Sequence, residues 1–181
     1  MMRALKIVFL VQVLLLSPLP AESDEVRLGP VIEQFGPVYD VPSIGFKLDP
    51  EIRYRSVMDV SASPESAAEL NRSIESAARF LNMHARAGVP ASNLELAVVL
   101  HGSAGKDALS DKAYAVRFGT NNPNTQLLHA LKEAGVEIYL CGQTAGFRGF
   151  AAEELNPVVS LATSAMTVLT RLQVEGWALL P

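Results

Sequence analysis

The sequence predicts a single α/β domain in which a parallel sheet carries helices on both faces. Two observations predict it: segments with strand patterning alternate with segments of helical spacing throughout residues 51–181, and the connections between them are short. Short connections between parallel strands require right-handed crossovers through a helix, so the helices must pack against the sheet. The size agrees, because 181 residues with 49% hydrophobic positions suffice for one hydrophobic core.

Residues 1–21 are typical of a secretory signal peptide and are excluded from the predicted fold. Arg3 and Lys6 precede the apolar run Ile7–Leu16, which is shorter than the roughly 20 residues of a membrane-spanning helix. A helix-breaking stretch that ends at Ala21 predicts cleavage after that residue, and an uncleaved anchor is the alternative. Cleavage leaves 13 basic and 19 acidic side chains. The sequence therefore predicts a soluble, acidic protein that is periplasmic or secreted and is not attached to a membrane.

Residues 22–50 predict an extended N-terminal arm. Glycines and prolines punctuate this segment, with single apolar residues between them, and a short strand is expected at Val31-Ile32. The arm carries Phe35, Tyr39 and Phe46, so we expect it to dock on a protein surface, either its own domain or a neighbouring subunit.

The first part of the domain, which spans 51–181, predicts a strand, a helix and a second strand. Residues 52–60 alternate as a strand does, and Ser63-Pro64-Glu65 predicts the cap and first turn of a helix that Gly88 ends. The nearly continuous apolar run Leu94–Leu100 predicts a strand buried on both faces. A glycine-containing loop, His101–Gly105, follows it.

The remaining residues predict three more strands, each connected through a helix. Strands are expected at 136–140, 158–162 and 177–180, and helices at 106–118, 122–134, from about 144, and 164–174. These elements together predict a flavodoxin- or Rossmann-like parallel sheet of about five strands with helices on both faces.

The candidate site lies where the predicted strands end, because ligands of open parallel sheets gather at the carboxyl ends of the strands. Of the residues that follow the strands, only His101 and Cys141 exchange a proton near neutral pH. Each is followed by a glycine, Gly102 or Gly142, which lets the backbone turn sharply or approach a ligand closely.

Cys141 is the stronger candidate, because the start of a helix favours a thiolate over a thiol. The alternative is a small hydrophobic residue at the end of a strand. It is the one cysteine of the chain, which excludes an internal disulfide and a Cys-rich metal site. An unpaired thiol is a liability in an oxidising compartment, and this favours a functional role.

His101 could orient or protonate a ligand, or it could bind loop carbonyls in a structural role. A Cys–His–acid arrangement would need Asp59 or Asp107 as its carboxylate. His84 is expected to pack at the opposite end of the sheet and His129 to be solvated, so no metal site is expected. The net charge of −4 indicates no basic surface for nucleic acid, and no dinucleotide, P-loop or G-x-S-x-G motif occurs.

Three segments resemble the DsrE/DsrF-like sulfur-relay family in its exported, stand-alone branch. They are Leu94–Gly102, Asn122–Asn124 and Leu131–Gln143. Arg148-Gly149 and Ser164–Thr167 extend the resemblance, which covers about residues 50–181.

The resemblance implies a flavodoxin-like fold and assembly into trimers or hexamers. It implies that Cys141 accepts sulfane sulfur as a persulfide and passes it to a partner's thiol, without a metal or organic cofactor. Gly142, Gln143 and Thr144 would then donate N–H groups to the anion, with His101 and Gly102 at the same sheet edge. Two other readings stay open: a non-catalytic module that binds a small ligand at this edge, and an oligomeric interaction protein whose arm crosses to a neighbour.

Overall fold

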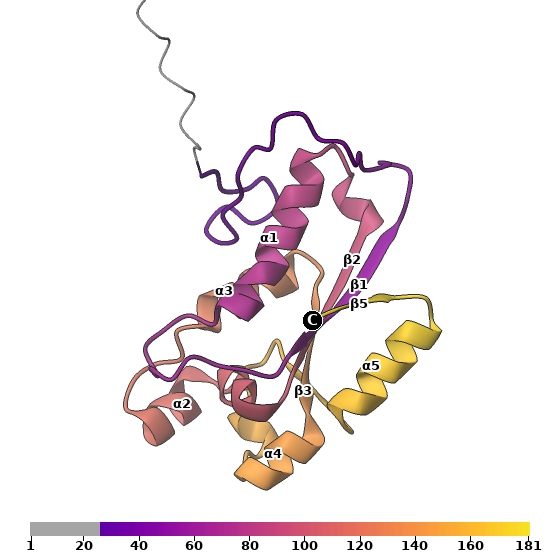
Figure 1. The fold of residues 1–181 in the computed structure, drawn as a ribbon. Coiled ribbons are helices and arrows are strands. Elements are labelled where there is room, and N and C mark those ends of the chain that lie inside the picture. The colour runs from indigo at the N-terminus through magenta and orange to yellow at the C-terminus, as the bar shows by residue number, and fades with distance from the viewer. Residues whose placement is uncertain (1–25) are drawn as a thin grey trace, which may run out of the picture.

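The computed structural model describes residues 26–181, and the expected signal peptide lies outside them (Figure 1). In chain order the elements are β1 (Tyr54–Val60), α1 (Arg72–Arg86), β2 (Leu94–Leu100), α2 (Asp111–Phe118), α3 (Thr125–Glu133), β3 (Glu137–Cys141), α4 (Gly142–Arg148), β4 (Ser160–Ala162), α5 (Ala165–Val174) and β5 (Ala178–Leu180). Three 3₁₀ turns lie between them: η1 (Ala91–Asn93), η2 (Gly102–Ala108) and η3 (Ala152–Glu154). Within residues 26–181, none of the helices combines the length and apolar character that crossing a bilayer requires.

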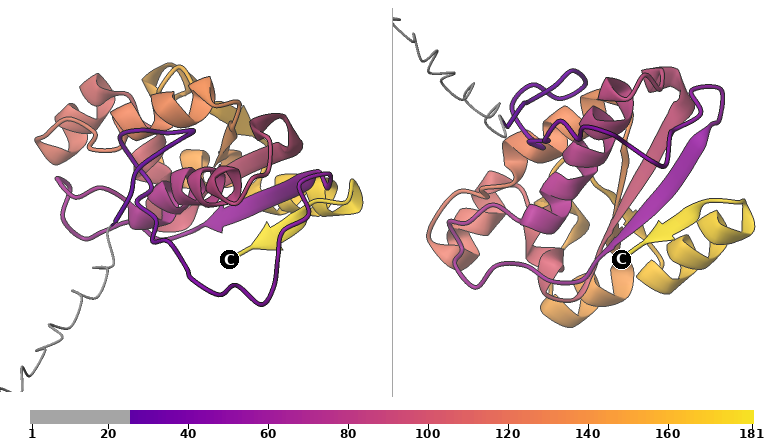
Figure 2. Two further views of the ribbon diagram at one scale, coloured as in Figure 1. Left: turned by 90° about the horizontal axis from the view of Figure 1, so that it is seen from above. Right: turned by 45° about the horizontal axis from the view of Figure 1, so that its top comes forward.

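The five strands form one sheet in the order β4-β3-β2-β1-β5, and every neighbouring pair is parallel. This confirms the predicted fold class. The chain steps outward from β1 to β4, and α5 then carries it back to the far side of β1. Because right-handed crossovers that run in opposite directions lie on opposite faces, α1 and α3 cover one face and α5 the other (Figures 1 and 2).

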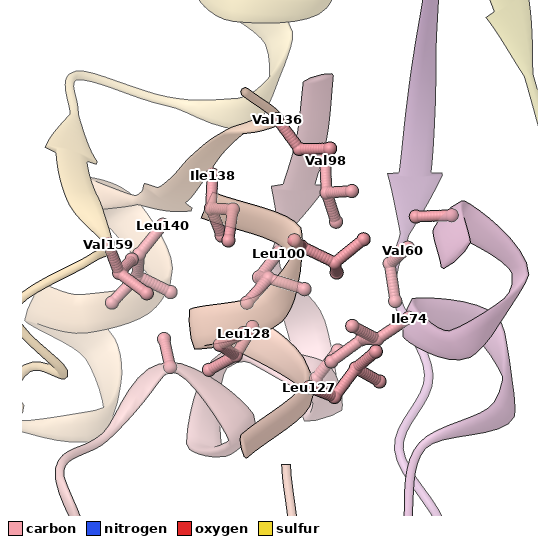
Figure 3. Packing of buried hydrophobic residues seen from close by; sticks show 14 of the residues in the cluster. Val60, Ile74, Val98, Leu100, Leu127, Leu128, Val136, Ile138, Leu140 and Val159 are labelled. Carbon is pink, nitrogen blue, oxygen red and sulfur yellow. The ribbon is translucent and has the colours of Figure 1, made fainter. Parts of the chain in front are cut away.

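The alternation of side chains along each strand divides the core into two layers. Figure 3 shows the larger one, in which Val60, Val98 and Leu100 of the sheet pack with Ile74 of α1 and Leu128 of α3. The smaller layer lies under α5 and contains Val57, Ala97, Val99, Cys141, Ala165 and Leu172. The thiol therefore points to the face that a single helix covers.

A buried polar cluster joins the segment after β1 to η2, and it shows that the predicted start of the first helix is wrong. The Ser63 hydroxyl donates to Asp107 Oδ1 at 2.9 Å, so it does not cap a helix. Asn71 Nδ2 donates to the other oxygen of Asp107 at 2.7 Å. The helix begins at Arg72, because Asn71 Oδ1 accepts the N–H groups of Ser73 and Ile74.

The N-terminal arm lies along α1 of its own chain, and one buried side chain of α1 holds it there by hydrogen bonds. Asn82 Oδ1 accepts the N–H groups of Val31 and Ile32 at 3.1 and 2.9 Å, and its Nδ2 donates to carbonyls of Ile32, Phe35 and Gly36. The prediction of a short strand at Val31-Ile32 is therefore wrong, because the N–H groups of these residues bond to a side chain and not to another strand.

Two further local expectations are wrong in detail. The segment after β2 is the 3₁₀ turn η2 and not an open loop, and the following helix begins at Asp111 and not at Lys106. The Ser110 hydroxyl accepts the N–H of Ala113 and so fixes this later start.

Candidate functional site

Asp59, His101 and Cys141 lie on one face of the sheet, at the carboxyl ends of three adjacent strands. Leu100 is in register with Val60 on one side and Leu140 on the other, so His101 and Cys141 leave neighbouring strands side by side. Their backbones are still extended, and strand alternation directs all three side chains to the face that α5 covers. The fold thus brings the two predicted site residues to one place.

The environment of Cys141 favours the thiolate. The residue is 6% exposed, and this burial raises the pKa of the thiol. Hydrogen bonds from the backbone of Thr144 and Ala165, the Thr144 hydroxyl and the Gln143 backbone lower the pKa by more, so the net shift is below the ordinary value. The donors come from the first turns of both α4 and α5. A larger fraction of Cys141 is therefore ionised at neutral pH than of a free cysteine.

Of the three predicted donors, Gln143 and Thr144 lower the pKa of the thiol. Gly142 matters instead because there is no room for a side chain at its position. A Cβ atom at Gly142 would lie 2.5 Å from the Ala162 carbonyl oxygen and 3.1 Å from that of Thr163. Glycine at this position lets α4 begin directly against the end of β4. The Gln143 side chain strengthens the same junction, because its Nε2 donates to the Thr163 carbonyl at 3.3 Å.

Thr144 connects Cys141 to the segment that follows β2. Its Oγ1 accepts the N–H of Gly102 at 3.2 Å, and its hydroxyl helps to lower the pKa of Cys141. Gly102 has a φ of +55°, and a Cβ there would meet the Ser61 carbonyl oxygen at 2.7 Å, so a larger residue does not fit. Arg148 Nε holds the same turn by donating to the Gly102 carbonyl at 2.9 Å.

His101 is paired with Asp59. Its Nε2 lies 2.7 Å from Asp59 Oδ1, and the two side chains are 29% and 33% exposed. Of the two carboxylates that the sequence suggested, the structure therefore selects Asp59. Asp107 is fully buried and bonds to Ser63, Asn71 and Lys106, away from the imidazole.

The other two histidines lie outside this site. His84 is buried in the last turn of α1, where Nδ1 lies 2.8 Å from the Phe80 carbonyl and the ring packs 4.0 Å from that of Phe80. His129 is half-buried on α3. Among the residues that the structure describes, no group of three or more His, Cys, Asp or Glu side chains is arranged to hold a metal ion.

Sequence reasoning missed two donors that lower the pKa of the thiol, the hydroxyl of Thr144 and the N–H of Ala165. The second is the less expected. It belongs to the first turn of α5, where the Ser164 hydroxyl accepts the N–H of Thr167 at 3.0 Å. The sequence indicates that Ser164 caps a helix. It does not indicate that this helix begins near Cys141, because that depends on the position of β4 beside β3.

A groove of about 400 Å³ lies next to the site, between α5 and the strands β3 and β4. Thr163 and Thr167 line its end near Cys141. The rest of the lining includes Glu137, Tyr139, Arg171, Glu175 and Trp177 as well as apolar side chains of α5 and β4. The Thr163 carbonyl also accepts a hydrogen bond from the Gln143 side chain, so Thr163 lies between the groove and the segment that follows Cys141.

Comparison with known proteins gives a family and a fold. A model of the DsrE/DsrF-like family matches residues 55–181. Two similar solved structures are MTH1491 of Methanobacterium thermoautotrophicum, described as a protein of unknown function, and the ychN protein of E. coli. Each has 20% sequence identity and a TM-score of 0.52, over 70% of this chain and 97% of the other, which establishes the fold alone. No significantly similar curated protein was found.

Proposed function

The chain belongs to the DsrE/DsrF-like family, and we propose that it is a sulfur carrier in which Cys141 holds sulfane sulfur as a persulfide and passes it to a partner's thiol. Family membership supports a function of the sulfur-relay type. The observation that carries the finer proposal is the group of donors around Cys141, which lowers the pKa of its thiol.

Two thiolate displacements perform the proposed transfer. In the first, the Cys141 thiolate attacks the outer sulfur of a donor R–S–SH; a new S–S bond forms on Cys141, and the old one breaks to release R–S⁻. In the second, an acceptor thiolate attacks the outer sulfur of the Cys141 persulfide and regenerates the Cys141 thiolate. Each leaving thiolate takes the electron pair of the broken bond, so the exchange is balanced without a metal or an organic cofactor.

The donors around Cys141 serve both steps. Gln143, Thr144 and Ala165 favour the charged form of the Cys141 sulfur, which is an anion before loading and again after discharge. Hydrogen bonds to an anion are stronger than those to a neutral group, so they favour Cys141 both as attacking thiolate and as leaving group.

The proposal extends to place and partners. The signal-peptide pattern of residues 1–21 supports export, so the donor and acceptor would be a periplasmic or secreted protein thiol or a small sulfane species. Assembly into a trimer or hexamer is proposed as well. Phe147 and Met166 support it, because both are highly exposed apolar side chains on α4 and α5, the helices whose first turns lie at Cys141.

Intact mass spectrometry tests the function. The mature protein is incubated with polysulfide, and the Cys141→Ser variant and a reduced wild-type sample are measured beside it. We expect a mass gain of ~32 Da per sulfur atom in the wild type, absent from the variant and removed by reductant. Absence of the adduct in the wild type, together with slow alkylation of Cys141, would contradict the proposal.

The groove beside α5 favours a second candidate function, a module that binds a small ligand without sulfur chemistry. A volume of about 400 Å³ with threonine, tyrosine and carboxylate side chains would hold a small polar molecule. In that case the wild type and Cys141→Ser would bind the ligand equally well, and neither would retain sulfur.

A further inference from the structure

We infer that His101, held by Asp59, is the proton-exchange group of sulfur transfer: it takes the proton from an incoming acceptor thiol and gives one to the thiolate that leaves the donor. This inference rests on the proposed function. It assigns a role to the His101–Asp59 pair, which takes no part in the two thiolate displacements as written above. His101 would be the catalytic residue and Asp59 its positioning residue.

The first argument is placement. His101 follows β2, and its N–H donates to the Val60 carbonyl of β1 at 3.0 Å, which continues the strand pairing one residue beyond β2. Cys141 occupies the equivalent position on the adjacent strand β3. A molecule whose sulfur reaches Cys141 from the open edge of the sheet therefore arrives beside the imidazole.

The second argument is the protonation pattern of the ring. A carboxylate accepts hydrogen bonds and cannot donate them, so the 2.7 Å contact with Asp59 Oδ1 assigns the ring hydrogen to Nε2. The lone pair of the neutral ring is then on Nδ1. This is the form that accepts a proton.

The third argument is accessibility together with the surrounding charges. His101 is 29% exposed, in contrast to the buried His84, whose Nδ1 bonds to a backbone carbonyl. Asp59 of β1 pairs with the ring, Cys141 of β3 lies on the adjacent strand, and Arg148 of α4 holds the Gly102 carbonyl. On the other face of the sheet, Lys106 and Asp107 of η2 bond to each other. The first turn of α5 has no acidic side chain.

The proton balance closes over the two steps. During loading, the imidazolium protonates the leaving R–S⁻ and becomes neutral. During discharge, Nδ1 takes the proton of the acceptor R′–SH as its sulfur attacks the persulfide, which restores the imidazolium and the Cys141 thiolate. One proton thus passes from the acceptor thiol to the donor's thiolate for each sulfur atom transferred.

The test compares discharge to two acceptors of different acidity at pH 7. Persulfide-loaded wild type, His101→Gln and Asp59→Asn are mixed with a weakly acidic alkyl thiol or with an aromatic thiol that is already ionised. A proton acceptor helps only a thiol that still carries its proton. We therefore expect His101→Gln to discharge to the alkyl thiol about tenfold more slowly or worse, to keep its rate with the aromatic thiol, and Asp59→Asn to change in the same direction.

The control is His129→Gln, on α3 and outside the site, which should match the wild type with both thiols. Equal slowing of His101→Gln with both acceptors, or no slowing, would overturn the role of His101 while leaving the proposed function intact. Failure of the wild type to take up sulfur would overturn both. Circular dichroism checks that the variants are folded, and His101→Asn provides a second substitution in case His101→Gln is not.

Discussion

At the scale of single residues, Thr144 determines much of the chemistry expected of Cys141. Its backbone N–H and its hydroxyl both lower the pKa of Cys141, against the opposing effect of burial. The same hydroxyl oxygen accepts the N–H of Gly102. The reactivity of Cys141 therefore depends on one side chain that also orders the segment after β2.

Replacing Thr144 by valine tests this dependence. The substitution removes the hydroxyl and keeps the shape of the side chain, so we expect the pKa of Cys141 to rise and alkylation by iodoacetamide to slow at neutral pH. The rates should converge above the higher of the two pKa values, where the thiol is ionised in both proteins. The measurement is the alkylation rate from pH 5 to 10.

The matched control is Thr170→Val, on the exposed side of α5. It should reproduce the wild-type pH profile. A Thr144→Val profile with the wild-type midpoint would mean that the backbone donors alone set the pKa of Cys141.

The sequence alone identifies the two reactive side chains of the site, but not the carboxylate that pairs with His101. His101 and Cys141 are recognisable because each follows an apolar strand and precedes a glycine. The choice between Asp59 and Asp107 was not possible, because it depends on which face of the sheet each carboxylate occupies. Asp59 is in register with Val99 of β2, two residues before His101, and only the strand register shows this.

At the scale of elements, the junction between β3 and α4 requires a residue without a side chain. The Ala162 and Thr163 carbonyls of the adjacent connection leave no room for a Cβ at Gly142. Both obstructing atoms belong to the backbone, so relief requires a shift of β4 or of α4. The glycine thus holds the first turn of α4 where its N–H groups reach Cys141.

We expect Gly142→Ala to destabilise the fold by about 1–3 kcal/mol, since it overpacks a backbone contact. Gly146→Ala is the matched control in the same helix: a Cβ there meets nothing within 4 Å, so its effect should be neutral or slightly stabilising. Chemical denaturation of the two variants measures the difference. Equal stabilities would show that α4 moves freely relative to β4.

Local signals predict those elements whose ends are fixed by nearby residues. The strand Leu94–Leu100 coincides with its apolar run, and α5 begins after Ser164 and ends before Gly176 as its caps indicate. The predicted start of the first helix was wrong because Asp107, 44 residues further on, binds the hydroxyl of Ser63. A motif cannot indicate a competing partner that only the tertiary structure brings near.

At the scale of the whole molecule, the strand order leaves the two faces of the sheet unequally covered. Three crossovers progress from β1 to β4 in one direction and one returns, so α5 alone covers its face. Phe147 is 90% exposed and Met166 is 75% exposed, on the two helices whose first turns contact Cys141. Large apolar side chains that are this exposed on neighbouring helices are typical of an interface.

We therefore expect the mature protein to have a mass three or six times that of its chain in light scattering. The double variant Phe147→Glu, Met166→Glu should shift the mass to that of a monomer, because charged side chains oppose burial in an interface. Met83→Glu, near the C-terminal end of α1 where Met83 is also exposed, should leave the mass unchanged and so controls for added charge. A monomeric wild type would contradict the oligomer. A double variant that keeps the wild-type mass would exclude these two side chains from the interface.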